Sequence, residues 1–294
     1  MDVLKTLTTS SWQEPFPTHL QTEMTDALES GQVLFFPKLA FQLTENEQHV
    51  FSPSYVNLKS KNISFNKMTN EVRGLASDVP AEKYAFLQSF LLRFANQAQD
   101  FVEAVFPHYQ SSIVMGRTSF RPVEVNGRIS SYRKDDTRLH VDAFPSNPNH
   151  GWRILRVFCN INPFDQPRVW RLGEPFEDVV KQFLPKLKKP LPGSAALLHL
   201  LKITKKRRTA YDHFMLQLHD NMKADTVYQQ KALQQEIRFP SNSTWIVQTD
   251  HVSHAAMSGQ HLLEQTFYLP IHAMQDESRS PLRVLEKIMQ RALI

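Results

Sequence analysis

The sequence predicts an α+β protein with a double-stranded β-helix core, a cupin-like jelly roll, covered by N-terminal helices and followed by a C-terminal helix. Three observations predict this fold. They are a long amphipathic helix pattern in the first third, a series of short extended segments after it, and two groups of metal-binding residue types that lie 112 residues apart. We expect one domain over residues 1–294, with a helical cover at about 1–110, a jelly-roll core at about 115–270, a basic insertion at about 181–208 and a C-terminal helix at about 281–294.

The composition is that of a globular protein with a large core, at 294 residues, 41% hydrophobic and 21% charged. The clearest helix pattern covers residues 81–106, where apolar residues recur every three or four positions and Pro107 ends the run. This aromatic stripe predicts packing against a sheet. Further helices are expected at residues 22–30 and 281–293. Another is expected to begin after Thr44 as its N-cap, with Glu47 at the capping-box position.

Extended segments make up most of the remainder. We expect strands at residues 32–36, 119–124, 129–132, 139–144, 153–160, 169–171, 235–239, 244–249 and 262–269. The pattern of residues 211–219 fits a helix and a strand equally well. The eight glycines form neither a phosphate-binding loop nor a nucleophile elbow, which excludes those two classes of site.

The stretch 139–144 places an imidazole and a carboxylate two residues apart. Residues i and i+2 of a strand point to the same face, so His140 and Asp142 are expected to bind one metal ion together. A Pro-rich loop, residues 145–151, follows the pair and would leave one side of it open.

The third metal ligand is expected from the segment that follows the apolar run 245–250. Two histidines compete for this place, His251 and His254. We favour His254, because the small residues Ala255 and Ala256 follow it and would allow a cofactor to approach. Two His and one carboxylate on one face of an octahedron form the facial triad of non-haem Fe(II) oxygenases.

A 2-oxoglutarate cosubstrate needs a buried cation for its distal carboxylate, and the planar fork of Arg suits it. Many such enzymes carry this Arg about ten residues after the distal His, but here Glu264 and Gln265 occupy the place. We favour Arg156, because a charged residue inside an apolar strand needs a partner. Arg121, on the preceding strand, is the second choice. Weaker candidates are Arg153 and Arg168.

The net charge of +5 is distributed unevenly. From Lys181 to Arg208 there are nine Lys or Arg and no acidic residue, which predicts either a solvated face or a surface for a polyanion such as lipid, phosphorylated glycolipid or nucleic acid. The lone Cys159 lies in an apolar run and is expected to be a buried hydrophobe in a reducing compartment. No signal-peptide pattern and no run of about 20 apolar residues occurs, so we expect a cytoplasmic protein.

Five stretches resemble one known family. They are Arg138–Pro145, Arg153–Pro163, Val169–Arg171, Val252–Gly259 and Leu263–Phe267. Together they are similar to the Kdo 3-hydroxylases, Fe(II)- and 2-oxoglutarate-dependent dioxygenases of Gram-negative bacteria. These enzymes hydroxylate C3 of 3-deoxy-D-manno-oct-2-ulosonic acid (Kdo) in the lipopolysaccharide inner core. The resemblance extends over about residues 31–270.

The resemblance implies that the iron ligands are His140, Asp142 and His254 and that the cosubstrate pocket contains Arg121, Arg156 and Trp170. It implies a Kdo-containing lipid A precursor as acceptor, with succinate and CO2 as products. The cationic block would then hold the protein at the anionic cytoplasmic leaflet of the inner membrane, and no nucleic-acid partner is expected. The residues alone leave two alternatives open. One is a 2-oxoglutarate oxygenase for another small molecule, and the other is a non-catalytic cupin-like module that holds zinc or no metal.

Overall fold

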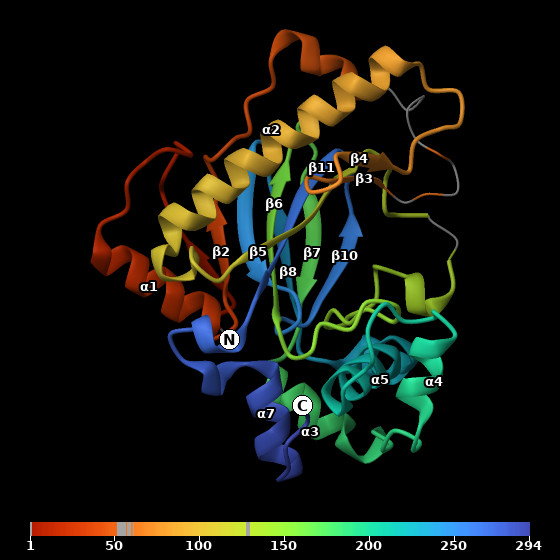
Figure 1. Cartoon of the computed structure of the whole chain (residues 1–294). Helices are drawn as coiled ribbons and strands as arrows, with labels where there is room; N and C mark the ends of the chain where they lie inside the picture. Colours follow the sequence, from red (N-terminus) through yellow and green to blue (C-terminus); the bar gives the residue numbers. More distant parts are fainter. Residues whose placement is uncertain (1, 52–56, 58–59, 61, 128–129) are drawn as a thin grey trace.

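Two β-sheets and a set of covering helices make up the chain (Figure 1). This computed structural model describes residues 2–51, 57, 60, 62–127 and 130–294. The strands are β1 (Leu4–Thr6), β2 (Val33–Phe36), β3 (Ile63–Asn66), β4 (Glu71–Arg73), β5 (Val114–Arg121), β6 (Arg153–Asn160), β7 (Arg168–Leu172), β8 (Gln235–Phe239), β9 (Ser243–Gln248), β10 (His254–Ser258) and β11 (Leu262–Leu269). The α-helices are α1 (Thr18–Glu29), α2 (Ala81–Val105), α3 (Phe176–Phe183), α4 (Ser194–Leu200), α5 (Ala210–Ala224), α6 (Thr226–Lys231) and α7 (Pro281–Met289).

The larger sheet has eight strands in the order β1-β2-β9-β6-β11-β5-β3-β4, and the smaller has three in the order β10-β7-β8. All neighbouring pairs are antiparallel except β1 and β2. Residues 1–110, expected to be a helical cover, also supply the four strands at the two edges of the larger sheet. The α+β class predicted from the sequence agrees with this arrangement.

Helices α1 and α2 lie across one face of the larger sheet (Figure 1). The side chains of β6 show how the helices contact the sheet, because they point alternately to its two faces. Leu155, Val157 and Cys159 face the helices and join their apolar core, whereas Phe158 packs with β7, β8 and β9 on the other face. Successive strand residues point to opposite faces, so Arg156 shares the face of Phe158, between the two sheets.

The region between β7 and β8 folds mainly as helices. Residues 211–219, ambiguous in the sequence, belong to α5, which begins with a capping box formed by Thr209 and Asp212. Helices α3, α5 and α7 share a second apolar core, which Leu139 and Val141 enter from the segment that carries the predicted metal ligands. No helix in the described part of the chain has both the length and the apolar character needed to cross a bilayer.

Four sequence-based boundaries need correction. Residues 139–144 do not form a strand, since only His140 is bridged, to His254, before the Pro-rich loop turns away. Of the strand expected at 129–132, residue 129 lies outside the described residues, and residues 132–134 form a 3₁₀ turn. The helix expected after Thr44 is 3₁₀ over Glu45–Phe51. The C-terminal helix ends at Met289, because Gln290 adopts a left-handed conformation.

One fully buried ion pair fixes the start of β6 to the turn after β9. Arg153 Nε donates to Asp250 Oδ2 at 2.8 Å, and both side chains are completely buried. Removal of one partner of such a pair leaves an uncompensated charge in the interior, which usually costs about 3–5 kcal/mol. The exposed pair between Arg238 and Glu236 offers a matched comparison, because exposed pairs contribute at most about 1 kcal/mol.

We therefore predict that Asp250→Ala lowers the free energy of unfolding by about 3–5 kcal/mol, whereas Glu236→Ala lowers it by less than about 1 kcal/mol. Urea denaturation followed by circular dichroism measures both. Equal losses in the two variants would show that the buried pair does not hold β6 to the β9 turn.

Candidate active site

The three predicted metal ligands, two of them neighbours in the sequence and the third 112 residues further on, converge between the two sheets. One ligand atom from each of His140, Asp142 and His254 lies within 4.8 Å of those of the other two. Both histidines are 6% exposed, so the donors face a shielded space. This spacing is compatible with simultaneous coordination of one metal ion, whose ligand distances are about 2 Å.

Backbone hydrogen bonds hold the ligand-bearing segments in place. The His140 N–H donates to the His254 carbonyl at 3.0 Å, and the His254 N–H donates to the His140 carbonyl at 2.9 Å. The Asp142 N–H donates to the Thr249 carbonyl at 2.8 Å. The segment that carries His140 and Asp142 is therefore fixed to both ends of the β9–β10 turn without being a continuous strand.

Each histidine ring is oriented by a backbone carbonyl. His140 Nδ1 lies 2.7 Å from the Arg138 carbonyl, and His254 Nδ1 lies 2.8 Å from the Val252 carbonyl. A carbonyl oxygen only accepts hydrogen bonds, so both Nδ1 atoms carry the proton and both Nε2 atoms keep a free lone pair. A metal ligand needs this tautomer, and a carbonyl behind the ring is its usual support.

The charges of the donors also suit a cation. Burial lowers the pKa of His254 to about 3, and it lowers the pKa of His140, with Asp142 partly opposing the shift. Burial would raise the pKa of Asp142, but the positive charge of Arg156 outweighs it and holds that pKa well below its ordinary value. The site therefore presents two neutral imidazoles and one carboxylate at neutral pH.

A charged network surrounds the donors on the inner face of the larger sheet. Arg156 Nη2 lies 2.8 Å from Asp142 Oδ2, and Arg156 Nη1 donates to Glu264 Oε1 at 2.9 Å. Arg121 donates to the other oxygen of Glu264, from Nε at 2.9 Å and from Nη2 at 2.5 Å. Burial opposes ionisation of Glu264, but the two guanidinium groups lower its pKa below the ordinary value. Glu264, which stands where an Arg is usual, is thus shared between both favoured Arg candidates and neutralises them in part.

A cavity of about 60 Å³ lies beside the three donors. Its lining residues come from both sheets and the loops between them: Arg121, Asp136, His140, Asp142, Arg156, Phe158, Arg168, Trp170, His254, Ala256 and Leu262. All six residues predicted for the metal and the cosubstrate therefore lie in one place. Ala256, expected to leave room for a cofactor, is part of the wall.

Trp170 of β7 forms one side of this cavity and contacts His254, one of the candidate metal ligands. Its ring stacks on His254, with centroids 5.2 Å apart and an angle of 23° between the planes. Its Nε1 is buried and has no hydrogen-bond partner among the described residues. The indole therefore fixes the His254 ring from one face and keeps a free N–H donor.

Arg168, only a weak candidate in the sequence, lines the same cavity. Its Nη1 donates to the Gly259 carbonyl at 2.7 Å. Within the described part of the chain, its Nε has no hydrogen-bond partner and its guanidinium forms no ion pair. Burial, with the nearby charge of Arg121, lowers its pKa to about 9, so it stays cationic at neutral pH. Gly259 has a φ of +109°, and a Cβ there would lie 3.0 Å from Arg168 Cδ, so a larger residue would disturb this guanidinium.

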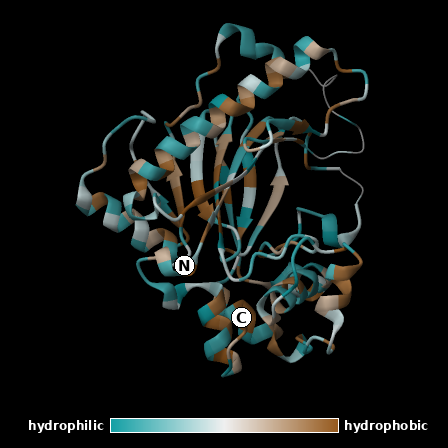
Figure 2. Ribbon diagram, viewed as in Figure 1, coloured by the Kyte–Doolittle hydropathy of each residue, from teal (hydrophilic) through white to brown (hydrophobic). Residues whose placement is uncertain are grey.

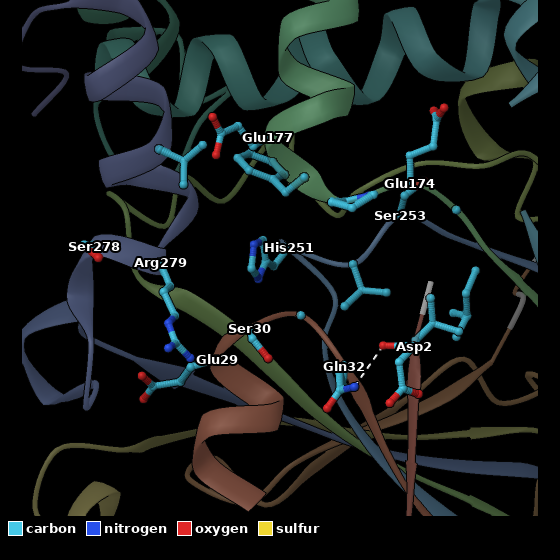
Figure 3. A pocket seen from close by; sticks show the side chains of 18 of the residues that line it. Asp2, Glu29, Ser30, Gln32, Glu174, Glu177, His251, Ser253, Ser278 and Arg279 are labelled. Carbon is cyan, nitrogen blue, oxygen red and sulfur yellow. Dashed lines mark hydrogen bonds between the residues drawn. The ribbon is translucent and has the colours of Figure 1, made fainter. Parts of the chain in front are cut away.

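The competing histidine, His251, does not join the metal donors. It lines a separate cavity of about 560 Å³ between α1, α3 and the segment before α7, and Figure 3 shows its ring at the centre of that cavity. Its Nδ1 has no hydrogen-bond partner among the residues that the structure describes, and its ring lies against Phe176 and Gly31. Arg153 is likewise outside the metal site, paired with Asp250.

Comparisons with known proteins agree with this geometry. The family described as 3-deoxy-D-manno-oct-2-ulosonic acid (Kdo) hydroxylase matches residues 11–292. The structure is similar to crystal structures of the Kdo hydroxylase KdoO, a non-haem Fe(II) α-ketoglutarate-dependent dioxygenase. The complex with cobalt(II) has a TM-score of 0.96 and the complex with α-ketoglutarate and Fe(III) a TM-score of 0.95. Each is 46% identical and covers 99% of this chain and 97% of its own.

A further KdoO structure contains succinate and Fe(III), and it has the same identity and coverage. A comparison with curated protein sequences finds no significant match. The family match extends over nearly the whole chain, and the similar structures exceed 30% identity over almost their full length. The chain belongs to the Kdo hydroxylase family.

Proposed function

We propose that this chain hydroxylates C3 of Kdo in a lipid A precursor, using Fe(II), 2-oxoglutarate and O2 and releasing succinate and CO2. The observation that carries the proposal is the convergence of three buried donors, His140, Asp142 and His254, in a chain that matches the Kdo hydroxylase family over residues 11–292. KdoO, at 46% identity, supports both the cofactor and the sugar.

The donor set fits Fe(II). Two neutral imidazoles and one carboxylate on one side of an ion leave three positions for other ligands. Bound Fe(II) would supply the oxidising chemistry, by activating O2 with electrons from 2-oxoglutarate. The residues of the chain hold the donors for it: two carbonyls set the histidine tautomers, Arg156 keeps Asp142 ionised, and Trp170 holds the His254 ring.

We propose that Arg121, Arg156 and Trp170 form the cosubstrate pocket and that Arg168 completes it. Glu264 already neutralises Arg121 and Arg156 in part, whereas Arg168 lacks a carboxylate partner among the described residues. A guanidinium with free donors in a buried cavity suits the distal carboxylate of 2-oxoglutarate. The free N–H of Trp170 offers a further donor to a cosubstrate oxygen.

The residues around the site also indicate how the two sheets are related. We infer that the eight-stranded and three-stranded sheets are the two halves of a jelly roll, because the residues around the metal donors come from both. Arg121, Arg156 and Leu262 belong to the larger sheet, and Trp170 and His254 to the smaller.

The acceptor suggests where the enzyme works. A Kdo-containing lipid A precursor lies in a membrane, and 2-oxoglutarate is a cytoplasmic metabolite. We therefore propose that the protein acts in the cytoplasm, with peripheral contact to the inner leaflet. Of the nine Lys and Arg from Lys181 to Arg208, the seven that form no ion pair with a described residue would carry the charge for this contact, since Lys181 and Lys186 are paired with carboxylates.

Product analysis tests the proposed function directly. With Fe(II), 2-oxoglutarate and O2, mass spectrometry should find one added oxygen atom on Kdo of the acceptor and one succinate per product. His140→Ala, Asp142→Asn and His254→Ala should each abolish this product and weaken Co(II) binding, measured by calorimetry, by more than about 100-fold, since loss of mere supporting residues already costs 10–100-fold.

His251→Ala is the matched control, because its ring lies in the separate cavity and should leave most Co(II) binding and activity intact. Loss of Co(II) binding in His251→Ala, with His254→Ala unaffected, would contradict the ligand assignment. A metal-loaded protein that consumes 2-oxoglutarate but never adds oxygen to Kdo would contradict the acceptor.

A second prediction concerns the cosubstrate. Loss of a charge-assisted contact in a desolvated pocket costs about 2–5 kcal/mol, so Arg168→Ala and Arg156→Ala should each raise the apparent KM for 2-oxoglutarate by roughly 30-fold to several thousand-fold. Arg156 also contacts Asp142, so Arg156→Ala should weaken Co(II) binding as well, whereas Arg168→Ala should not.

Arg171→Ala serves as control. Arg171 lies on the same strand as Arg168, but its side chain points to the opposite face of the sheet and does not line the cavity. An unchanged KM in Arg168→Ala would remove Arg168 from the cosubstrate pocket. An unchanged KM in Arg156→Ala would leave Arg121 as the remaining predicted cation.

A further inference from the structure

We propose that residues 188–206, called here the α4 tip, dock the protein on an anionic bilayer by inserting leucine side chains among the lipid acyl chains while neighbouring lysines contact the headgroups. The proposal deepens the proposed function, on which it rests for the lipid-linked acceptor. It goes beyond charge attraction, because it assigns a specific apolar surface to the membrane.

The α4 tip concentrates exposed apolar side chains. Of the thirteen most exposed large hydrophobics among the described residues, five lie here: Leu191, Leu197, Leu200, Leu201 and Ile203, at 53–77% exposure. Leu197, Leu200 and Leu201 stand at positions i, i+3 and i+4, so they share one face of the short helix. Figure 2 shows the hydrophobic colour of this helix at the outer edge of the molecule. Such a cluster marks an interaction surface rather than scattered exposure.

Cationic side chains flank these leucines on both sides in the sequence. They are Lys188, Lys189, Lys202, Lys205 and Lys206, none of which forms an ion pair with a described residue, and no acidic residue occurs between Asp178 and Asp212. An apolar cluster bordered by unneutralised lysines matches the two layers of an anionic bilayer surface.

The tip is ordered and attached to the loop that follows the metal ligands. Backbone hydrogen bonds from Ile203 and Thr204 to the Leu198 carbonyl close the turn after α4. The Lys205 N–H donates to the Ser146 carbonyl at 2.9 Å, and Arg208 donates to the Pro145 carbonyl. Residues 145 and 146 belong to the loop that follows Asp142. Docking of the tip would therefore bring this loop, and with it the candidate metal site, close to the membrane surface, where a lipid-linked sugar is presented.

A second copy of the chain fits this surface less well than a bilayer does. A twofold interface would bring the same unneutralised lysines of both copies together, and like charges in contact are unfavourable. Anionic lipid offers both an apolar layer and the opposite charge.

Site-specific fluorescence tests the insertion. The native Cys159 is fully buried, so a cysteine introduced by Leu200→Cys can be labelled selectively with an environment-sensitive dye. Phosphatidylethanolamine vesicles that contain phosphatidylglycerol should shift its emission to the blue, and lipids brominated in the acyl chain should quench it. The same dye at Leu233→Cys, an equally exposed position outside the tip, should show neither effect.

Cosedimentation with the same vesicles separates the apolar and charged contributions. Leu200→Ser combined with Leu201→Ser should weaken binding by at least about tenfold at low and at high salt, because burial of apolar surface is not screened. Lys205→Gln combined with Lys206→Gln should weaken it at low salt only. Val227→Ser combined with Leu233→Ser, equally exposed elsewhere, should bind like the parent.

Parent-like binding of the leucine variant, or an unshifted dye at position 200, would overturn the proposal. So would a concentration-dependent dimer, detected by ultracentrifugation, that the leucine variant loses. Uncoupled 2-oxoglutarate consumption by the leucine variant should equal that of the parent. If the parent docks on vesicles but never oxidises Kdo, the proposed function fails while the docking surface stands.

Discussion

The buried carboxylate of Glu264 is the interaction on which the site depends. It lies on β11 between Arg156 of β6 and Arg121 of β5 and accepts hydrogen bonds from both. Without it, the inner face of the larger sheet would carry adjacent unneutralised guanidinium groups, which repel each other in a medium of low dielectric constant. With Glu264 present, Arg156 is held by one guanidinium nitrogen and its other nitrogen lies against Asp142. Strands β5, β11 and β6 are thereby linked through Glu264 to the candidate metal site.

The metal donors are arranged by the backbone as much as by their own side chains. The reciprocal hydrogen bonds between His140 and His254 join a loop to the first residue of β10, and carbonyls behind each ring select the tautomer. Burial keeps both imidazoles neutral, since it disfavours their charged forms. The site is therefore prepared for a cation before one binds, which limits the reorganisation that binding requires.

Much of this arrangement could be predicted from local patterns. The apolar run of β6, the three-and-four spacing of α2 and the small residues after His254 are all visible within short windows of the sequence. The pairing of Arg121 with Glu264 could not be predicted, because it depends on the register between β5 and β11, 143 residues apart. Arg168 was only a weaker candidate, since only the folded cavity shows that it forms no ion pair with a described carboxylate. The segment 139–144 was expected to be a strand because it alternates like one, yet a single bridge and a Pro-rich loop determine its conformation.

The charged side chains that line the cavity balance one another. Three cations, Arg121, Arg156 and Arg168, and three carboxylates, Asp136, Asp142 and Glu264, line the cavity, so a bound divalent ion would balance the two charges of 2-oxoglutarate. Anaerobic calorimetry of 2-oxoglutarate binding, with and without Co(II), tests this most directly. Binding should be at least about tenfold tighter in the Co(II)-loaded protein, a coupling of about 1.4 kcal/mol or more. Equal affinity in the two forms would contradict it.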